Sequence, residues 1–310
     1  MIIRPYRFLN APFEREIIMP NWNFTHRTAR VNGVNIHYVI EGDGYPVVLL
    51  HGWPEMWFSW RKQIPVLSQD YQVIVPDMRG FGSSEKPLQD YRTRTAATDI
   101  YELVRHLGHD KIAIVGHDIG VRVSYRYCLD HEAEVDRLTL LDGTHPLEQL
   151  GPQTPEGVRE RWHSYFHQIP DLAEHLVRGN EEAYLRHFYR NWSVNQAMMS
   201  DEEVAVYATA YSQPGALRGG FSYYRAAAYE DPPDWRADAE RVLNIPVLYL
   251  WGERRQRTST ASGLDPEASW QKAASNLRTQ FIAGGGHFLH EEKPDEVNAA
   301  LLAFLGEIGS

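Results

Sequence analysis

The sequence predicts an α/β fold: a doubly wound, mostly parallel sheet that carries one all-helical insertion. Two observations predict the sheet. Short apolar runs, each ended by a turn residue, are typical of strands buried on both faces, and helical patterns lie between these runs, as in sheets built from alternating strands and helices. A third observation predicts the insertion, because about 100 residues after Gly143 contain helical, aromatic-rich sequence and no convincing strand.

The strands are expected in the following order along the chain. Residues 28–42 predict a hairpin, because Asn32-Gly33 is a favoured two-residue turn between strands. Five apolar runs then predict the buried strands: YPVVLLHG (45–52), YQVIVPD (71–77), KIAIVGHD (111–118), DRLTLLDG (136–143) and IPVLYLWG (245–252). A weaker sixth run lies around residues 279–282.

Two helices of the sheet layer have clear signals. Apolar residues recur at helical spacing over residues 97–107, and Gly108 follows as a C-terminal stop. The same spacing over residues 297–304 begins behind Pro294, a favoured residue in a first helical turn.

The order of elements also predicts the domain organisation. We expect residues 143–244 to form a helical cap domain over the carboxyl ends of the strands, where sheets of this kind bind ligands. The core then comprises residues 25–142 and 245–310, and residues 1–24 form an N-terminal extension without a recognisable pattern.

Composition excludes several classes of function. The chain has 31 Lys and Arg against 41 Asp and Glu, a net charge of −10, so it lacks the basic surface that nucleic acid requires. Its one cysteine, Cys128, excludes an intramolecular disulfide and a Cys-based zinc cluster. Charged residues interrupt the first 20 residues, and no run approaches the ~18 apolar residues of a membrane span. We therefore expect a cytoplasmic protein that binds a small molecule, without cofactor, metal, nucleic acid or membrane, and leave a homodimer open.

The most informative segment is GHDIG, residues 116–120, between a buried strand and a helix. Its two glycines permit the sharp, strained turn of a nucleophile elbow, which lifts the central side chain above the sheet. The central residue is Asp118 rather than serine. A carboxylate that attacks saturated carbon leaves an ester that water can hydrolyse, whereas a serine would leave an ether. Asp118 therefore predicts attack on an epoxide or alkyl halide, with simple capping of the helix as the alternative.

Four motifs in order carry a family resemblance: HGWPE (51–55), DMRGFGSSEKP (77–87), GHDIG (116–120) and GGGHFLHEEKP (284–294). Together they resemble the α/β-hydrolase superfamily, and more narrowly its branch of epoxide hydrolases and haloacetate dehalogenases, with the Cif-type bacterial epoxide hydrolases as the most similar group. The resemblance runs from about Thr25 to the C-terminus.

The resemblance implies a water-activating histidine after the last strand and an acid that orients it. His287, behind three glycines, has that position, with His290 as the nearest alternative. Many relatives place the acid after the W-G turn, where this sequence reads WGERRQRTS without an Asp. Asp142 ends the strand before the insertion, the position used by dehalogenases and Cif-type enzymes, so it is our choice and Glu253 the alternative.

The ester carbonyl would become an oxyanion, which needs two N–H donors. We expect these to be the backbone amides of Ile119, after the nucleophile, and Trp53, after His51-Gly52. The family often has a cis peptide before the proline that follows, here Pro54.

The insertion is expected to supply the leaving-group chemistry. The resemblance places the functional tyrosine at Tyr224, and the order Trp162-His163 is that of Cif-type epoxide hydrolases, in which the histidine joins the tyrosine at the epoxide oxygen. Fluoroacetate dehalogenases have the reverse order. The alternative role for these two rings is to pack the cap against the core. We further expect Trp162 and Tyr223 to contact the substrate.

The residue after the nucleophile also separates the two reactions. Fluoroacetate dehalogenases have an Arg there and another three residues later, and the pair binds the substrate carboxylate. This sequence has Ile119 and keeps only Arg122, which we also place among the substrate-binding residues. The sequence therefore favours a cofactor-independent epoxide hydrolase, with a haloacetate dehalogenase as the alternative and a catalytically silent binding protein as a third reading.

Overall fold

The computed structural model describes residues 23–150, 154–262, 265 and 267–309, so most of the expected N-terminal extension lies outside the described residues. Its eight-stranded sheet has the order β1-β2-β4-β3-β5-β6-β7-β8. The strands are β1 His26–Val31, β2 Val34–Glu41, β3 Tyr45–Leu50, β4 Tyr71–Pro76, β5 Ile112–His117, β6 Val135–Leu141, β7 Leu243–Gly252 and β8 Ala274–Ile282. Strand β2 runs antiparallel to both neighbours, and the other pairs are parallel. The predicted fold class is therefore confirmed.

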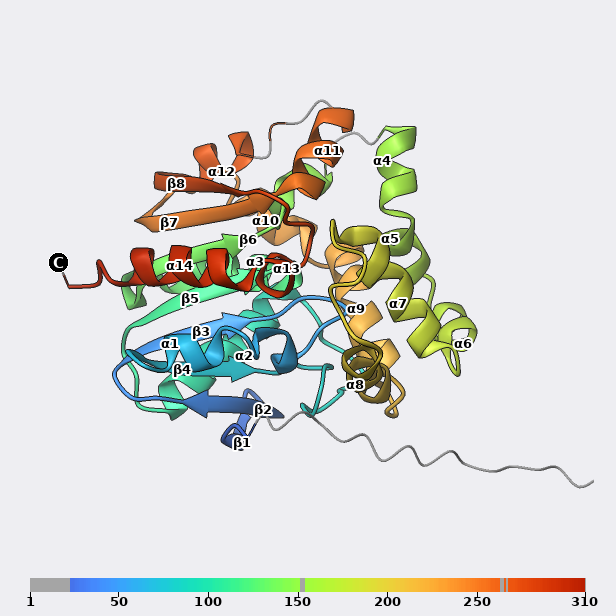
Figure 1. Cartoon of the computed structure of the whole chain (residues 1–310), viewed down its shortest axis with the longest axis horizontal. Helices are drawn as coiled ribbons and strands as arrows, with labels where there is room; N and C mark the ends of the chain where they lie inside the picture. Colours follow the sequence, from blue (N-terminus) through green and yellow to red (C-terminus); the bar gives the residue numbers. More distant parts are fainter. Residues whose placement is uncertain (1–22, 151–153, 263–264, 266, 310) are drawn as a thin grey trace, which may run out of the picture.

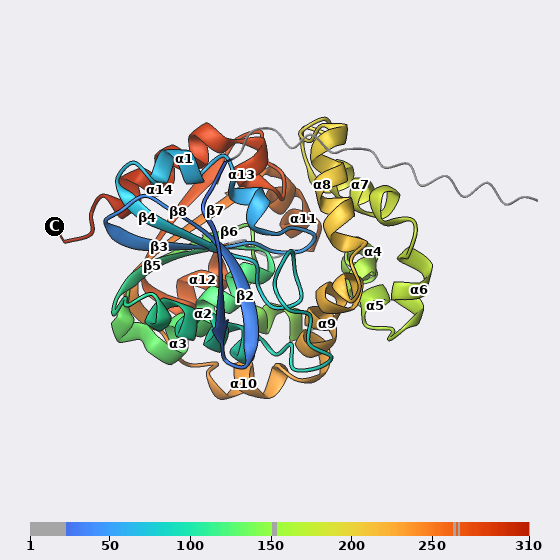
Figure 2. The ribbon, with the colours of Figure 1, turned by 90° about the horizontal axis from the view of Figure 1, so that it is seen from below.

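Local sequence explains the strands. In the hairpin, Asn32 and Gly33 both have positive φ, which the favoured two-residue hairpin turn requires. The apolar runs of β3 to β6 are almost fully buried, since helices cover both faces of the sheet. In Figure 2, α1, α13 and α14 lie on one side of the sheet and α2 and α3 on the other.

The helices of the sheet layer and their 3-10 turns have these bounds: η1 Trp57–Trp60, α1 Ile64–Leu67, α2 Thr93–His106, α3 Ile119–His131, η2 Glu132–Glu134, η3 Pro146–Leu150, α11 Glu253–Ser262, α12 Ala268–Ala273, α13 Leu289–Glu292 and α14 Pro294–Leu305. The two predicted helices are α2 and α14. Gly108 follows α2 with a φ of 85°, and Pro294 is the first residue of α14, as the sequence indicates.

The segment between β6 and β7 is helical: α4 Pro155–Glu160, α5 Trp162–His167, α6 Leu172–Val177, α7 Glu181–Trp192, α8 Asp201–Tyr211, α9 Ala216–Tyr229 and α10 Pro232–Ala237. Helices α4 to α9 lie together beside one end of the sheet (Figure 1). Their aromatic side chains contact Trp53, which follows β3, so this end is where the strands finish. Within the described part of the chain, no helix has the length and apolar character needed to cross a membrane.

Candidate active site

Asp118 occupies a strained turn between β5 and α3. Its φ is 50° and ψ −112°, a conformation that costs free energy in a non-glycine residue. Both flanking glycines are needed: a Cβ on Gly116 would lie 2.3 Å from the carbonyl oxygen of Gly120, and one on Gly120 would lie 2.4 Å from that of Leu50. The elbow therefore packs tightly on β3 and presents the Asp118 side chain, 24% exposed, at the end of the sheet.

The Asp118 carboxylate has two distinct contacts. Its Oδ1 accepts a hydrogen bond from the backbone N–H of Trp53 at 2.9 Å, and its Oδ2 lies 3.5 Å from Nε2 of His287. Burial by itself would raise the pKa of Asp118. The hydrogen bond and charge of His287, the charge of His117 and the hydrogen bond from the Trp53 amide outweigh that effect and hold the pKa well below its usual range. Asp118 is therefore ionised at neutral pH, as a carboxylate nucleophile must be.

The expected base and acid meet at this carboxylate. His287 directs Nδ1 to Oδ2 of Asp142 at 2.6 Å, while its Nε2 faces Asp118. Asp142 is fully buried at the end of β6 and also has a positive φ, 46°. An imidazole that donates from Nδ1 to a carboxylate keeps Nε2 free to accept a proton.

The two alternatives lie elsewhere. Glu253 accepts a hydrogen bond from the backbone N–H of Gly284 at 2.8 Å, so its carboxylate supports the glycine loop rather than the imidazole of His287. His290 is fully buried, stacks on Trp60 at 4.3 Å between ring centroids, and points Nε2 at Glu55.

Arg255 is a site residue that the sequence reasoning missed. It lies in α11, and its Nε donates to Oδ1 of Asp142 at 3.3 Å while its Nη2 donates to the backbone oxygen of the same residue. Burial alone would raise the pKa of Asp142, but the charge of Arg255 and the hydrogen bond and charge of His287 lower it below the usual value. The sequence reads Glu-Arg-Arg over residues 253–255, which by itself does not say which arginine would reach the acid.

A second group of ionisable side chains lies behind the base. Glu55 is 2.7 Å from Nδ1 of His117, and Nε2 of His117 bonds the backbone oxygen of His287 at 2.8 Å. Ligand atoms of Glu55, His117 and His290 lie within 4.8 Å of one another, close enough for a metal. Both nitrogens of His117 are already used, however. Although burial opposes it, the charge of Glu55 raises the pKa of His117 to about 9, which favours a protonated, hydrogen-bonded ion pair over a metal ligand.

The turn after β3 places the expected oxyanion donor. A Cβ on Gly52 would lie 2.3 Å from the Cβ of Asp118, so only glycine lets the Trp53 amide approach the carboxylate. The Trp53–Pro54 peptide is cis, as the resemblance implies. The second expected donor, the amide of Ile119, opens α3 directly after Asp118.

Two side chains of the insertion flank the indole of Trp53. The ring of His163 stacks on it at 6.1 Å, the ring of Tyr224 meets it edge-on at 5.8 Å, and the two rings are 5.7 Å apart. Burial lowers the pKa of His163 to about 3, so the imidazole is neutral, and its Nδ1 is buried without a hydrogen-bond partner among the described residues. Burial, followed by the charge of Asp118, raises the pKa of Tyr224 well above 10, so its hydroxyl stays protonated.

The three expected substrate-binding residues have different surroundings. Trp162 is 41% exposed and lines a surface groove of about 360 Å³ between α5, α6 and α7. The hydroxyl of Tyr223 donates to the backbone oxygen of Arg79 at 3.1 Å and anchors α9 to the core. Contact of either side chain with substrate stays a prediction. Arg122 is buried and lies near enough to Tyr224 to lower the pKa of that phenol slightly against the effect of burial.

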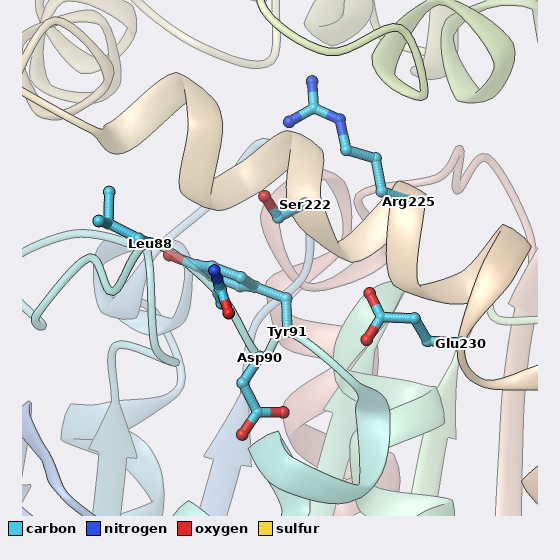
Figure 3. A pocket seen from close by; sticks show the side chains of 7 residues that line it. Leu88, Asp90, Tyr91, Ser222, Arg225 and Glu230 are labelled. Carbon is cyan, nitrogen blue, oxygen red and sulfur yellow. The ribbon is translucent and has the colours of Figure 1, made fainter.

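A further hollow of about 400 Å³ lies between residues 88–91 and α9 (Figure 3). Its charged groups do not converge: Arg225 and Asp90 point in opposite directions in Figure 3, and Arg225 pairs with Glu174 at 2.8 Å. None of its lining residues belongs to the group around Asp118, so we assign it no role in the chemistry.

Comparison with known proteins places this geometry in context. A sequence profile described as the alpha/beta hydrolase fold matches residues 45–294. The soluble epoxide hydrolase of Corynebacterium sp. (strain C12) is 39% identical over 288 residues, which cover 92% of this chain and 98% of that protein. The fluoroacetate dehalogenase of Burkholderia sp. is 30% identical over 294 residues, 93% of this chain and 95% of that protein. The solved structure of the epoxide hydrolase CorEH without ligand has a TM-score of 0.84 and 37% identity, and the match covers 92% of this chain and 99% of that one.

Proposed function

Because this chain belongs to the α/β-hydrolase family, in the branch that holds epoxide hydrolases and fluoroacetate dehalogenases, we propose that it opens an epoxide to a vicinal diol. It is a hydrolase of the α/β-hydrolase fold and is epoxide hydrolase-like over nearly its whole length. The reaction that we propose proceeds through an ester between the substrate and Asp118, and residues 143–244 act as its cap.

In the first step, Oδ2 of Asp118 attacks one epoxide carbon. The C–O bond of the ring breaks, its electron pair stays on oxygen, and the alkoxide takes a proton from Tyr224 while His163 donates a hydrogen bond. The Trp53 amide supports this assignment of oxygens, because it already holds Oδ1 and leaves Oδ2 for the attack. Both donors are neutral at pH 7, as the alkoxide requires.

In the second step, Nε2 of His287 takes a proton from a water that attacks the ester carbon Cγ of Asp118. Oδ1 becomes the oxyanion and is stabilised by the amides of Trp53 and Ile119. Asp142 stabilises the imidazolium through Nδ1. Collapse of the intermediate breaks the bond between Cγ and Oδ2, and Oδ2 leaves as a hydroxyl of the diol after taking the proton of the His287 imidazolium. The second proton of the water returns to the Tyr224 phenolate, and the Asp118 carboxylate is regenerated with one oxygen from water.

One observation carries the choice of an epoxide over a halide. A departing halide needs no proton, whereas an alkoxide does. Here the ring centroids of Tyr224 and neutral His163 are 5.7 Å apart, and both rings lie beside the indole of Trp53. Nδ1 of His163 has no hydrogen-bond partner among the described residues. Two neutral donors close to each other suit an epoxide oxygen, which must accept a hydrogen bond and a proton as the ring opens.

The proposal is tested by trapping the ester. In His287→Gln the alkylation step remains but the base is lost, so intact-mass spectra after incubation with styrene oxide should show the protein increased by the mass of one substrate. Peptide mapping should place the adduct on Asp118. The matched control, Asp118→Asn with the same substrate, should show no adduct. Absence of an adduct with a panel of aliphatic and aromatic epoxides would contradict the proposal.

A second candidate, dehalogenation of a small halo-acid, is favoured by Arg122. This guanidinium is buried in α3, and no hydrogen bond or ion pair links it to the described residues. Such a cation could receive a substrate carboxylate. Release of fluoride or chloride from the haloacetates, together with adducts in His287→Gln from chloroacetate but not from epoxides, would decide for this reaction.

A further inference from the structure

The contacts of Asp142 extend beyond His287. We infer that Arg255 is a positioning residue, which shares the charge of Asp142 and so keeps His287 available as a neutral base when the ester is hydrolysed. The inference rests on the proposed function, because it assigns Arg255 to the second step of that reaction only.

Asp142 lies between His287 and Arg255 and bonds both side chains. The two carboxylate oxygens of Asp142 are divided: Oδ2 is 2.6 Å from Nδ1 of His287 and Oδ1 is 3.3 Å from Nε of Arg255. The second nitrogen of the same guanidinium donates to the backbone oxygen of Asp142. Arg255 therefore holds both the side chain and the backbone of a residue whose positive φ makes its turn strained.

The charge of Asp142 affects the base, His287. Asp142 is fully buried, and an ionised carboxylate in that position favours the imidazolium form of a bonded histidine. A base that is already protonated cannot accept the proton of water. Arg255 neutralises part of the carboxylate charge and so weakens this effect of Asp142 on the base. Asp142 then orients His287 through the hydrogen bond to Nδ1.

Other ionisable groups also face His287, and they set the background for this effect. They are Asp118 and His117 at the end of β5, His163 in α5, and Glu292 in α13. The charge of Arg254 in α11 acts on Asp142 and His163. Arg254 differs from its neighbour, because its guanidinium lies over the ring of Trp192 at 5.1 Å rather than on Asp142. Among the described residues, Arg255 alone makes an ion pair with Asp142 besides His287.

The position of Arg255 in the chain fits this role. It is the fourth residue after Trp251, in the first turn of a helix that begins where β7 ends, and its side chain is only 14% exposed. A charge buried to this extent is costly unless it is paired. The pair with Asp142 satisfies both partners and joins β6, β7 and the base-bearing loop.

The experiment separates the two chemical steps. Parent, Arg255→Gln, Arg255→Lys and Arg257→Met proteins are mixed with styrene oxide under single-turnover conditions from pH 5 to pH 9. Rapid-quench mass spectrometry follows formation and decay of the ester. Arg257 is exposed on the same helix, so its variant controls for removal of a positive charge from α11.

We expect ester formation in Arg255→Gln to stay within about threefold of the parent. The acid limb of ester hydrolysis should move upward by about one pH unit, the usual size of a nearby-charge effect, so that hydrolysis on that limb falls about tenfold. Arg255→Lys keeps the charge and should restore the limb to within a few tenths of a unit, and Arg257→Met should leave it unchanged.

Two outcomes would overturn the inference. In the first, the ester forms and decays in folded Arg255→Gln with the pH profile of the parent. In the second, the lysine variant behaves like the glutamine variant, which would show that geometry rather than charge matters. If Arg255→Gln does not fold, Arg255→Met carries the same comparison, and the lysine variant alone still tests retention of charge. If the parent forms no ester from any epoxide, the proposed function fails and this inference fails with it.

Discussion

At the scale of single residues, two buried histidines of the site, His163 and His117, have opposite protonation states at neutral pH. His163 and His117 are both buried histidines near Asp118. For the first, burial outweighs the charge of Asp118 and lowers the pKa to about 3, so the imidazole is neutral. For the second, burial lowers the pKa, but the charge and hydrogen bond of Glu55, with smaller effects of Asp118 and the backbone of His287, together outweigh it and raise the pKa to about 9. Environment rather than residue type therefore decides that His163 serves as a neutral donor and His117 as a cation.

The first prediction concerns the proton donor. Tyr224→Phe removes the hydroxyl that we propose as the proton donor to the alkoxide, so the rate of ester formation from an epoxide should fall by about 10²-fold or more. Decay of the ester should change little, because we assign that step to His287 and Asp142. Stopped-flow or rapid-quench measurement of the two phases tests this.

The neighbouring tyrosine provides the control. Tyr223→Phe removes a hydrogen bond to the backbone oxygen of Arg79 instead. We expect a small loss of stability, about 1 kcal/mol, with ester formation near the parent rate. Equal slowing by both substitutions would mean that the hydroxyls act through the position of α9 and not through proton transfer.

At the scale of elements, local patterns predicted what depends on local geometry. The buried runs became β3 to β7, and the glycines of GHDIG became the elbow, because period and turn chemistry are read over a few residues. Side chains on adjacent helix positions point about 100° apart, so the two members of a neighbouring pair have different surroundings. Trp162 lines a surface groove and Tyr223 bonds the backbone of Arg79, and contact of either with substrate stays a prediction.

Other parts of the site depend on contacts between distant segments. The pairing of Asp142 with His287 was expected only through the family resemblance. The contact between Arg255 and Asp142 joins positions 113 residues apart, and no local pattern indicates it. The contact forms because β6 and β7 are parallel neighbours, so Asp142 at the end of β6 and Arg255 in the helix after β7 lie at the same edge of the sheet.

The second prediction concerns the link between the insertion and the base-bearing loop. Glu292 accepts hydrogen bonds from the backbone N–H groups of Gly286, Val194 and Asn195. Glu292→Gln replaces one acceptor oxygen by an NH₂ group, which cannot accept from these amides. We expect a loss of about 1 kcal/mol in the free energy of unfolding, measured by urea denaturation, since at least one of these amides loses its acceptor.

The matched control is Glu296→Gln, which removes an exposed carboxylate from the neighbouring helix α14. Its loss should stay within about 0.5 kcal/mol, as is usual for exposed ion pairs. Equal effects of the two substitutions would contradict the assignment of Glu292 as the link between the two segments.

At the scale of the whole molecule, buried charge joins the core to the insertion. Arg61, after η1, bonds Glu291 in α13 and Glu203 in α8 of the insertion. The hydroxyl of Tyr189 in α7 donates to the backbone oxygen of Pro54 at 2.7 Å. These contacts surround the turn that holds the Trp53 amide, which supports our proposal that the insertion acts as a cap over Asp118. They also make the stability of the molecule depend on the ionisation of buried groups.

The third prediction is the pH dependence of that stability. The pKa of His117 is raised to about 9 in the folded chain against 6.5 when unfolded, so its contribution is complete below pH 6.5 and is lost as the pH rises through 9. Burial lowers the pKa of His163 to about 3 and that of His145 to about 4. Below pH 6.5 these two histidines are protonated in the unfolded chain but stay neutral in the folded chain, so the free energy of unfolding falls as the pH falls. We expect these histidines together to place the maximum of unfolding free energy near pH 6.5.

Glu55→Gln isolates the alkaline part of this profile. Glutamine can still bond Nδ1 of His117, but it removes the charge that raises the pKa of that histidine. The parent should be the more stable protein at pH 6, and its advantage should shrink by roughly 3 kcal/mol between pH 6 and pH 9.5, the free-energy equivalent of the difference between pKa values of 9 and 6.5. Chemical denaturation of both proteins at these two pH values measures the change, and the effects of groups that do not interact with Glu55 cancel in the difference. A constant advantage would mean that Glu55 stabilises the fold only through neutral hydrogen bonds, and that His117 is not a cation in the folded protein.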